Sequence, residues 1–428
     1  MNLPATAVIR PSHAARSLAT AEVRERWQLR RVGITWYLLV LNAATFYKGL
    51  SGFPIPGSVG KIVTQGALPV ALVFALSVNR RLLVRPNVFL CLVGLLVLDT
   101  ILTIMEPQHF GTLYRTVRFV EFYAVLWLLT PWWGRRDLFL LRCHLRAYYV
   151  LLISAGVGIF LFPGKSLGGG RLTGAIWPIP PPQVAHYSAI VIGLVLVLWL
   201  GGVLAGRQAL LISAGSLIIL ILTHTRTALL AMVVGVIIAG LSLIKAKPRV
   251  RRFFAWAGAL VGITLLTASS LLVTWLARGE GTSELKNLTG RTKVWGPLLS
   301  FPRDKFQEIF GFGLSNSSFN GLAIDSNWLS SYQEQGLLGA VTCGVILFFL
   351  MATAYLQPRG VQRALALFLI TYCLIASFTE DGFTDATTYL LELTLAASLF
   401  VPSFLVSKKA APARPVDAPL APDFDEVG

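Results

Sequence analysis

Residues 184–204 read VAHYSAIVIGLVLVLWLGGVL and contain no Asp, Glu, Lys or Arg. A helix of roughly 20 apolar residues is long enough to cross the hydrocarbon core of a bilayer. The segment therefore predicts a transmembrane helix, and it decides the fold class because similar segments recur along the chain. Of the 428 residues, 55% are hydrophobic and only 13% are charged, whereas a soluble domain has roughly 25% charged residues. With a mean hydropathy of +0.68, this composition excludes a soluble enzyme.

The apolar segments predict an all-α, polytopic transmembrane bundle of about twelve helices. Residues 1–31 are expected to form a basic cytoplasmic tail, 32–406 the membrane domain, and 407–428 a disordered cytoplasmic tail rich in Ala, Pro and Asp. An extracytoplasmic loop, 277–333, is expected to cap the bundle between the ninth and tenth helices. The expected helices lie near 32–48, 61–79, 87–105, 112–131, 145–162, 184–204, 208–223, 226–244, 253–276, 334–356, 363–379 and 386–406.

The basic residues set the expected orientation. The chain has 37 Lys and Arg against 20 Asp and Glu, a net charge of +17. Cytoplasmic loops of membrane proteins are enriched in Lys and Arg. In a twelve-helix chain whose N-terminus is inside, the Lys245–Arg252 cluster and the Lys408–Lys409 pair both fall on the cytoplasmic side. This distribution predicts that both termini are cytoplasmic in a bacterial inner membrane. The excess of positive charge is then explained by the orientation of the helices and by contact with membrane lipid, and no nucleic-acid partner is expected.

The cysteines are scattered through the chain and form no CxxC motif or Cys/His cluster, so no metal ion or other cofactor is predicted. They are Cys91, Cys143, Cys343 and Cys373.

Three arginines stand in segments expected at the extracytoplasmic side. Arg226 lies in HTRTA, Arg171 follows three glycines in GGGRLTG, and Arg291 lies in LTGRTKVW together with Lys293. Taken singly, each has a structural alternative, either a side chain that reaches the headgroups or a solvated loop charge. If they converge, guanidinium groups suit a pyrophosphate at the membrane surface, because fixed cations stabilise the charge that a diphosphate leaving group develops.

Asp325 is the carboxylate best placed to act as a general base for a sugar hydroxyl. The alternative is a helix N-cap, which Asp, Ser and Asn all favour. Glu334 and His224 are possible supporting residues, and Glu334 could instead begin the tenth helix. Arg118 and Glu121 are three residues apart, a spacing that predicts an ion pair within one helix.

Four segments together resemble the bacterial O-antigen ligase and Wzy-type polysaccharide polymerase superfamily. Arg171-Leu172-Thr173-Gly174 is similar to its R-x-x-G segment, and Thr225-Arg226-Thr227-Ala228 to its S/T-R-x-A helix start. Gly290-Arg291 with Trp295 is similar to its G-R-x-x-x-W element. The fourth segment runs from Asp325-Ser326-Asn327 through Glu334 to Gly336-Leu337-Leu338-Gly339 and is similar to its H/D-[NS]-x-x-L…E-x-G-L-L-G segment.

The resemblance implies a helical bundle with a loop cap and a glycosyltransferase activity that needs no cofactor. The donor would be a glycan on undecaprenyl pyrophosphate, and an acceptor hydroxyl would attack its anomeric carbon. Arg226 and Arg291 would hold the pyrophosphate, assisted by Arg171. Asp325 would be the base or would orient the acceptor. Other polysaccharide assembly proteins would be possible partners.

Two functions inside this family and one outside it stay open. An Asp at position 325, where ligases have His, favours a polymerase that makes exopolysaccharide, capsule or O-antigen. The first large outer segment, near 163–183, is short for a polymerase and favours a ligase that transfers the glycan to a lipid or protein. A transporter or flippase is the alternative class, and Asp99, an isolated acid inside the third expected helix, would suit its proton path.

Overall fold

The computed structural model describes residues 13–53, 56–104, 110–135, 137–245, 247–267, 292–314 and 318–400. In this part of the chain the fold is all-α apart from one short antiparallel hairpin, β1 (Ser318–Phe319) with β2 (Leu322–Ala323). The principal helices are α1 (His13–Ala43), α2 (Gly57–Val78), α3 (Val88–Thr103), α4 (Phe110–Leu129), α5 (Phe139–Leu161), α7 (Pro181–Leu200), α8 (Gly206–Leu222), α9 (Arg226–Leu243), α10 (Pro248–Thr267), α15 (Asn327–Leu356), α16 (Val361–Ala376) and α17 (Thr388–Ser398).

Each apolar segment predicted from the sequence overlaps one of these helices. The largest differences among the helix starts are at α1, which begins at His13, well before the expected 32, and at α15, which begins at Asn327, before the expected 334. Both extensions consist of polar helical turns, which a search for apolar runs does not detect. The proposed tail after residue 406 lies outside the described residues.

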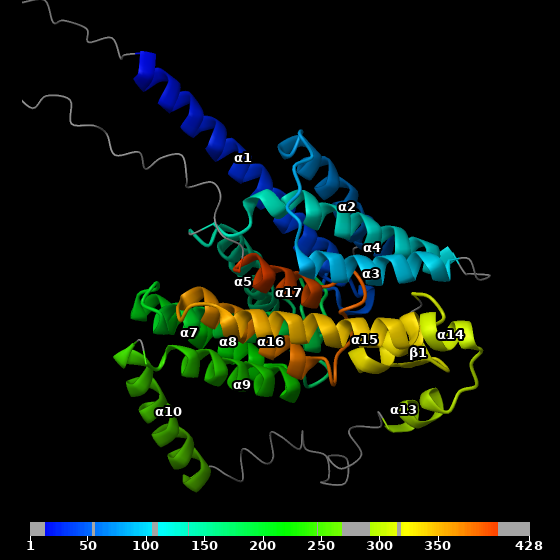
Figure 1. The fold of residues 1–428 in the computed structure, drawn as a ribbon. Coiled ribbons are helices and arrows are strands. Elements are labelled where there is room, and N and C mark those ends of the chain that lie inside the picture. Colours follow the sequence, from blue (N-terminus) through cyan, green and yellow to red (C-terminus); the bar gives the residue numbers. More distant parts are fainter. Residues whose placement is uncertain are drawn as a thin grey trace, which may run out of the picture.

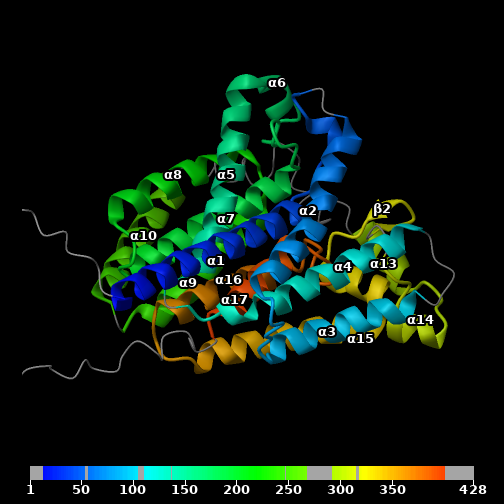
Figure 2. The same ribbon diagram turned by 90° about the horizontal axis from the view of Figure 1, so that it is seen from above.

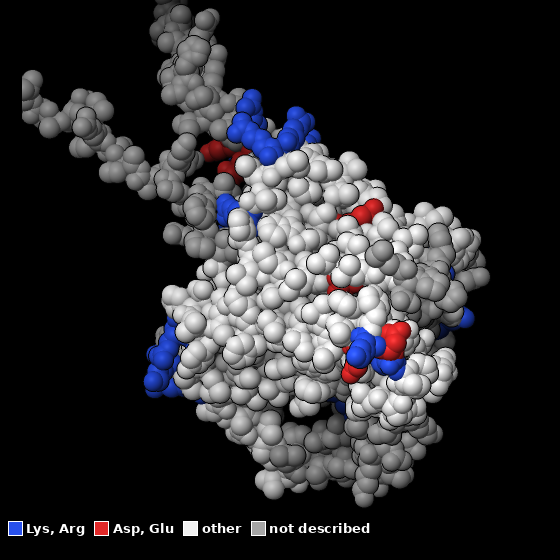
Figure 3. Space-filling view, turned by 45° about the vertical axis from the view of Figure 1, so that its right-hand side comes forward, with Lys and Arg blue, Asp and Glu red and all other residues white. Residues whose placement is uncertain are grey.

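Five of the described helices, α2, α5, α7, α9 and α15, are long and apolar enough to cross a membrane, and α3, α8 and α16 are shorter apolar helices. The outer surface is itself apolar: Phe348 is 76% exposed and Leu266 is 87% exposed. Large apolar side chains gathered on a surface mark contact with lipid or with another apolar surface. By helix length and hydropathy, the chain is a multi-pass membrane protein. Figure 3 shows the same property, since charged side chains form a few separate patches on a largely uncharged surface.

Helices α7, α8, α9, α15 and α16 run side by side, and α3 and α4 lie against the α15 side of this group (Figure 1). Helix α5 crosses their direction steeply and carries the short α6 (Pro163–Ser166) at its end (Figure 2). Helix α7 lies at the centre with its side chains almost all buried. The ring of Phe368 on α16 lies against Gly193 of α7 and Gly235 of α9, where any side chain would collide with it. Small residues thus allow these three helices to approach closely.

A polar cluster is enclosed within the bundle. His186 of α7 lies 2.6 Å from the carboxylate of Glu392 on α17, and the Tyr148 hydroxyl donates to the same oxygen at 2.9 Å. All three side chains are buried. Because these buried side chains contact one another in the core, the cluster joins α5, α7 and α17.

The short elements of the cap gather where α15 begins (Figures 1 and 2). They are α13 (Thr292–Leu299), α14 (Lys305–Phe310) and the β1–β2 hairpin. Arg303 fastens this cap to α15, because it donates to the Tyr332 carbonyl at 3.0 Å and to the Gln333 side chain at 2.8 Å. Its guanidinium also stacks on the Tyr332 ring, 4.2 Å from the centroid.

Helix α15 is interrupted at Gly336, whose φ of 62° and ψ of −160° are non-helical. The backbone of α14 and Gly311 fills the interruption so closely that a Cβ on Gly336 would overlap the Ile309 carbonyl group. The freed backbone groups are paired, since Gly313 N–H donates to the Glu334 carbonyl at 2.8 Å. The cap therefore packs into the break in α15.

Candidate functional site

Arg171 joins two loops at the end of the bundle where α9 begins. Its Nε donates to the Thr223 carbonyl oxygen at 2.9 Å, and its Nη2 donates to the Thr225 hydroxyl at 3.1 Å. A neighbouring backbone bond, Leu172 N to Leu222 O at 2.8 Å, holds the same two segments together. The planar guanidinium thus fixes the glycine-rich loop to the turn between α8 and α9.

Arg226 is the first residue of α9 and follows that turn directly. Its Nε is buried and has no hydrogen-bond partner among the described residues. Thr225, at the N-cap position, makes no side-chain cap bond to α9, because its hydroxyl accepts from Arg171. A helix N-terminus without such a cap presents N–H donors and a partial positive charge. Arg226 and the first turn of α9 therefore offer adjacent donors to an anion.

Arg171 and Arg226 are neighbours at this turn, because the Arg171 guanidinium donates to Thr225, the residue directly before Arg226. Burial lowers the pKa of the Arg171 guanidinium, Glu380 raises it and Arg226 lowers it, with a net decrease from the ordinary value. An arginine remains protonated in proteins despite such a decrease. Two cations and the Glu380 carboxylate thus lie within electrostatic range of one another. Glu380 was not selected from the sequence, since nothing in its local pattern distinguishes it.

The connection between α16 and α17, residues 377–387, brings the other predicted elements to this end. Thr379 donates to the hydroxyl of Thr227, next to Arg226, at 2.8 Å. Asn327, at the start of α15, accepts from the backbone N–H groups of Gly382 at 3.3 Å and Phe383 at 2.8 Å. The 377–387 connection thereby contacts the starts of both α9 and α15.

Asp325 is exposed and lies just before α15. The residue at the N-cap position is Ser326, so the N-cap alternative for Asp325 is wrong by one residue. Asp325 lies two residues before Asn327, whose side chain bonds the 377–387 connection. His224 lies in the α8–α9 turn with a φ of 50°, a left-handed conformation that is rare for a residue with a side chain.

Glu334 does not begin α15 and is not part of an exposed site. It lies within the helix, just before the break at Gly336, and is fully buried. Its Oε1 accepts from Arg115 Nη1 at 2.8 Å. The same guanidinium donates from Nε and Nη2 to Asp385 at 3.0 Å. Arg115 therefore joins the break in α15 to the 377–387 connection.

Arg118, one turn further along α4, also turns to this connection instead of pairing with Glu121 as the spacing predicted. It lies 3.6 Å from the Asp385 carboxylate and donates to the Ala386 carbonyl at 2.5 Å. Its Nε donates to Asn42 at 3.1 Å, and Asn42 in turn donates to the Thr64 carbonyl at 2.9 Å. Arg115, Arg118, Glu334 and Asp385 form what we call the ionic hub, which links α1, α2, α4 and α15 to the 377–387 connection.

Burial by itself would raise the pKa of the Asp385 carboxyl group. Arg115, Arg118 and the backbone N–H of Ala386 outweigh that effect and hold this pKa below its usual value. Asp385 is therefore ionised at neutral pH and faces two guanidinium groups. This network of ion pairs and hydrogen bonds positions the connection that carries Thr379 and Glu380.

Two predicted site residues cannot be placed. Arg291 lies outside the described residues, and so does the side chain of Lys293. The convergence of the three arginines therefore stays a prediction, although Arg171 bonds Thr225, the residue directly before Arg226. Within the described ranges, no group of three His, Cys, Asp or Glu is arranged to hold a metal ion.

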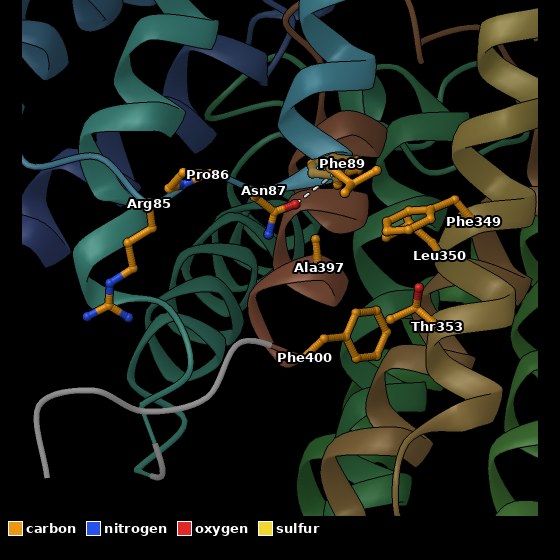
Figure 4. A pocket seen from close by; sticks show the side chains of 10 residues that line it. Arg85, Pro86, Asn87, Phe89, Phe349, Leu350, Thr353, Ala397 and Phe400 are labelled. Carbon is orange, nitrogen blue, oxygen red and sulfur yellow. Dashed lines mark hydrogen bonds between the residues drawn. The ribbon is translucent and has the colours of Figure 1, made fainter. Parts of the chain in front are cut away.

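Four cavities lie toward the opposite end of the bundle, where α15 and α17 finish. Figure 4 shows one of about 630 Å³, with Phe349, Leu350 and Thr353 from α15 facing Ala397 and Phe400. Asn87, at the start of α3, caps that helix by accepting from Phe89 N at 2.8 Å. The lining is mainly apolar, and it lacks the paired cations of the Arg171 and Arg226 region.

Comparison of the chain with protein families and with curated proteins finds no match.

Proposed function

We propose that this protein is a glycosyltransferase of the bacterial inner membrane that uses a glycan on undecaprenyl pyrophosphate as donor. It transfers the glycan to a hydroxyl of another lipid-linked glycan, and so acts as a polysaccharide polymerase. The observation that carries the proposal is the position of Arg171, which bonds Thr225 directly before Arg226 at the start of α9, together with the buried Nε–H of Arg226 that has no partner among the described residues. These donors suit a diphosphate.

In the proposed reaction, the acceptor oxygen forms a bond to the anomeric carbon while the bond from that carbon to the pyrophosphate oxygen breaks. The acceptor proton passes to a carboxylate, and undecaprenyl pyrophosphate leaves with the bonding electrons. Arg226 and Arg171 stabilise the negative charge that develops on the leaving group. Asp325 receives the proton or orients the acceptor, and Glu380 is a second carboxylate near the arginine pair.

The proposed topology has about twelve spanning helices, both termini in the cytoplasm and the arginine pair at the periplasmic face. The positions of three helix ends support this topology. The starts of α9 and α15 and the end of α16 meet around the 377–387 connection, and the proposed topology puts all three at the periplasmic face. Lys245, Arg251 and Arg252 then lie at the cytoplasmic end, as the distribution of positive charge requires.

Reconstitution with a polyprenyl-pyrophosphate oligosaccharide tests the proposal. Longer lipid-linked glycans mark a polymerase, whereas transfer to a second lipid or to protein marks the ligase alternative. We expect Arg226→Ala to lower turnover by roughly 100-fold or more, the usual effect of removing one donor that stabilises a transition-state charge. Lys165→Ala, which removes an exposed cation of α6, is the matched control. Normal turnover of well-folded Arg226→Ala would exclude this site.

The break in α15 favours one function of another class. Discontinuous helices with charged residues beside the break are common in transporters, and Glu334 lies two residues before Gly336. Translocation of a labelled lipid-linked oligosaccharide across proteoliposomes, with no change in its glycan length, would support a transporter or flippase and count against the glycosyltransferase.

A further inference from the structure

A large basic cavity lies at the end of the bundle remote from the arginine pair. It has a volume of about 1190 Å³ and lies between α1, the α2–α3 connection and the α4–α5 connection. Helix α4 spans the distance between the two regions. Arg115 lies near its start, and Pro131 and Trp132, just beyond its end, line the cavity. A rise of 1.5 Å per residue separates these positions by about 25 Å, close to the thickness of a bilayer core.

The lining of this cavity is strongly cationic. Five arginines oppose the single acid Glu25, and they are Arg24, Arg31, Arg80, Arg81 and Arg135. Arg135 is paired with Glu25 at 3.3 Å and with Asp137 at 3.2 Å. Among the residues that the structure describes, the other four make no ion pair. Four uncompensated cations around one cavity create a site for an anion.

Hydrogen bonds from one buried side chain to the backbone hold the loop at the edge of this cavity in place. Asn79 is buried, and its side chain donates to the carbonyls of Leu83 at 2.6 Å and Leu128 at 3.0 Å. It also accepts from Leu83 N at 2.9 Å. These bonds hold the loop that carries Arg80 and Arg81 against the end of α4, so the position of the two cations does not depend on a bound ligand.

The rim has the amphiphilic character of a membrane interface. Trp27 and Trp132 line the cavity, and Trp is enriched at the level of lipid headgroups. Leu82 and Leu83 are each 60% exposed directly after the arginine pair. A soluble anion would contact only the cations, whereas the acyl chains of a lipid would also contact these apolar side chains.

We propose that this cavity binds the phosphate headgroup of an anionic phospholipid, with Arg24, Arg31, Arg80 and Arg81 as its cationic contacts. The acyl chains lie along the exposed Leu82 and Leu83. Basic pockets between membrane helices recognise such headgroups at the cytoplasmic face, where anionic lipids attract Lys and Arg. The proposal does not depend on the glycosyltransferase activity, since the cavity is remote from Arg171 and Arg226.

Native mass spectrometry of the full chain, with phosphatidylglycerol or phosphatidylcholine added to detergent micelles, tests the inference. We expect saturable retention of phosphatidylglycerol alone. The double variant Arg80→Gln/Arg81→Gln should weaken that binding roughly thirtyfold, because each cation near an anionic surface contributes roughly fivefold. Arg251→Gln/Arg252→Gln, two exposed cations on α10 outside the cavity, is the matched control and should bind normally.

If the Arg80 and Arg81 variant does not fold, Arg24→Gln/Arg31→Gln removes two exposed cations from the α1 wall and should give the same loss. Equal retention of both lipids, or equal weakening in the α10 control, would overturn the proposal. Complete displacement of the lipid by inorganic phosphate at the same concentration would also overturn it, because the site would then bind a free anion.

Discussion

Arg171 donates its Nε–H to the backbone carbonyl oxygen of Thr223 at 2.9 Å. The bond ties the glycine-rich loop before α7 to the turn that leads into Arg226. The Nη2 group of the same guanidinium donates to the Thr225 hydroxyl. The planar geometry of the guanidinium, in addition to its charge, therefore holds the turn. Arg171 therefore both positions the turn and adds a positive charge to the candidate site.

We expect Arg171→Lys to lower turnover about tenfold, since an ammonium keeps the charge but cannot donate in the same fork geometry. Arg171→Ala should lower it about 100-fold, because both the geometry and the charge are lost. Steady-state kinetics with the lipid-linked donor measures both variants beside Lys165→Ala. Full activity of Arg171→Lys together with a strong loss in Arg171→Ala would assign the effect to charge alone.

Asp325 and Glu380 are the two carboxylates that we consider as the base. Asp325 directly precedes Ser326, the N-cap of α15, and Glu380 acts on the charge of Arg171. If Asp325 removes the acceptor proton, Asp325→Asn should lower kcat by about 10²–10⁴-fold, the usual contribution of a general base. Glu380→Gln should then mainly change KM. The reverse pattern would transfer the role of base to Glu380. Purified variants with unchanged unfolding temperatures make the comparison valid.

The ionic hub should be sensitive to removal of one charge at a time. Arg115→Gln leaves Glu334 buried without its cationic partner and should lower the free energy of unfolding by about 3–5 kcal/mol. Arg115→Gln/Glu334→Gln should recover part of that loss, since no uncompensated acid remains at Glu334. Arg142→Gln is the control, because its surface pair with Asp137 (3.2 Å) contributes at most about 1 kcal/mol.

Thermal unfolding in one detergent measures these three variants and the single variant Glu334→Gln. A double variant that is less stable than Arg115→Gln by the full effect of Glu334→Gln would mean that the two side chains act independently, contrary to their 2.8 Å contact.

Gly336→Ala should destabilise the protein by more than about 2 kcal/mol. Its positive φ is strained for any other residue, and the added Cβ would overlap the Ile309 carbonyl group. Gly344→Ala, on the same helix, is the control, because its Cβ would meet only the Trp328 ring at 3.7 Å. Similar unfolding temperatures for the two variants would show that α14 is not seated in the break.

Asp385 should make stability depend on acid pH. Its pKa in the folded protein lies below the ordinary value, which is about 3.9 for an unfolded chain. Its stabilising contribution is therefore complete above the unfolded value and is lost as the pH falls through the folded one. Unfolding temperatures between pH 7 and pH 3 should fall less steeply for Asp385→Asn than for the unchanged protein. Parallel curves would contradict this assignment.

Local hydrophobicity was enough to predict the helices, because a run of apolar residues must be buried in lipid or core wherever it occurs. It could not locate the start of α1 at His13 or of α15 at Asn327, where the first turns are polar. The break at Gly336 was also missed. It depends on α14, whose backbone takes the place of the missing helical hydrogen bonds.

The candidate site was predictable only in part. Arg226 was selected because a charge between two apolar segments is unusual, and Arg171 because it follows three glycines that allow close approach of the backbone to a ligand. The structure bonds Arg171 to Thr225, the residue before Arg226. Arg115 was overlooked, since its partners Glu334 and Asp385 are 219 and 270 residues away. Arg118 was expected to pair locally with Glu121, but a buried acid elsewhere in the fold competes more strongly than a neighbour on the same helix.

The sequence by itself determined that this is an all-α, multi-pass membrane protein, because composition and helix length depend on short stretches of chain. Tertiary structure decided which charges meet. Arg171 bonds the α8–α9 turn that leads into Arg226, and the ionic hub holds the 377–387 connection, whose Thr379 bonds Thr227. Pairing between distant charges depends on how helices pack, and the packing depends on small residues such as Gly193 and Gly235 that let α16 approach α7 and α9.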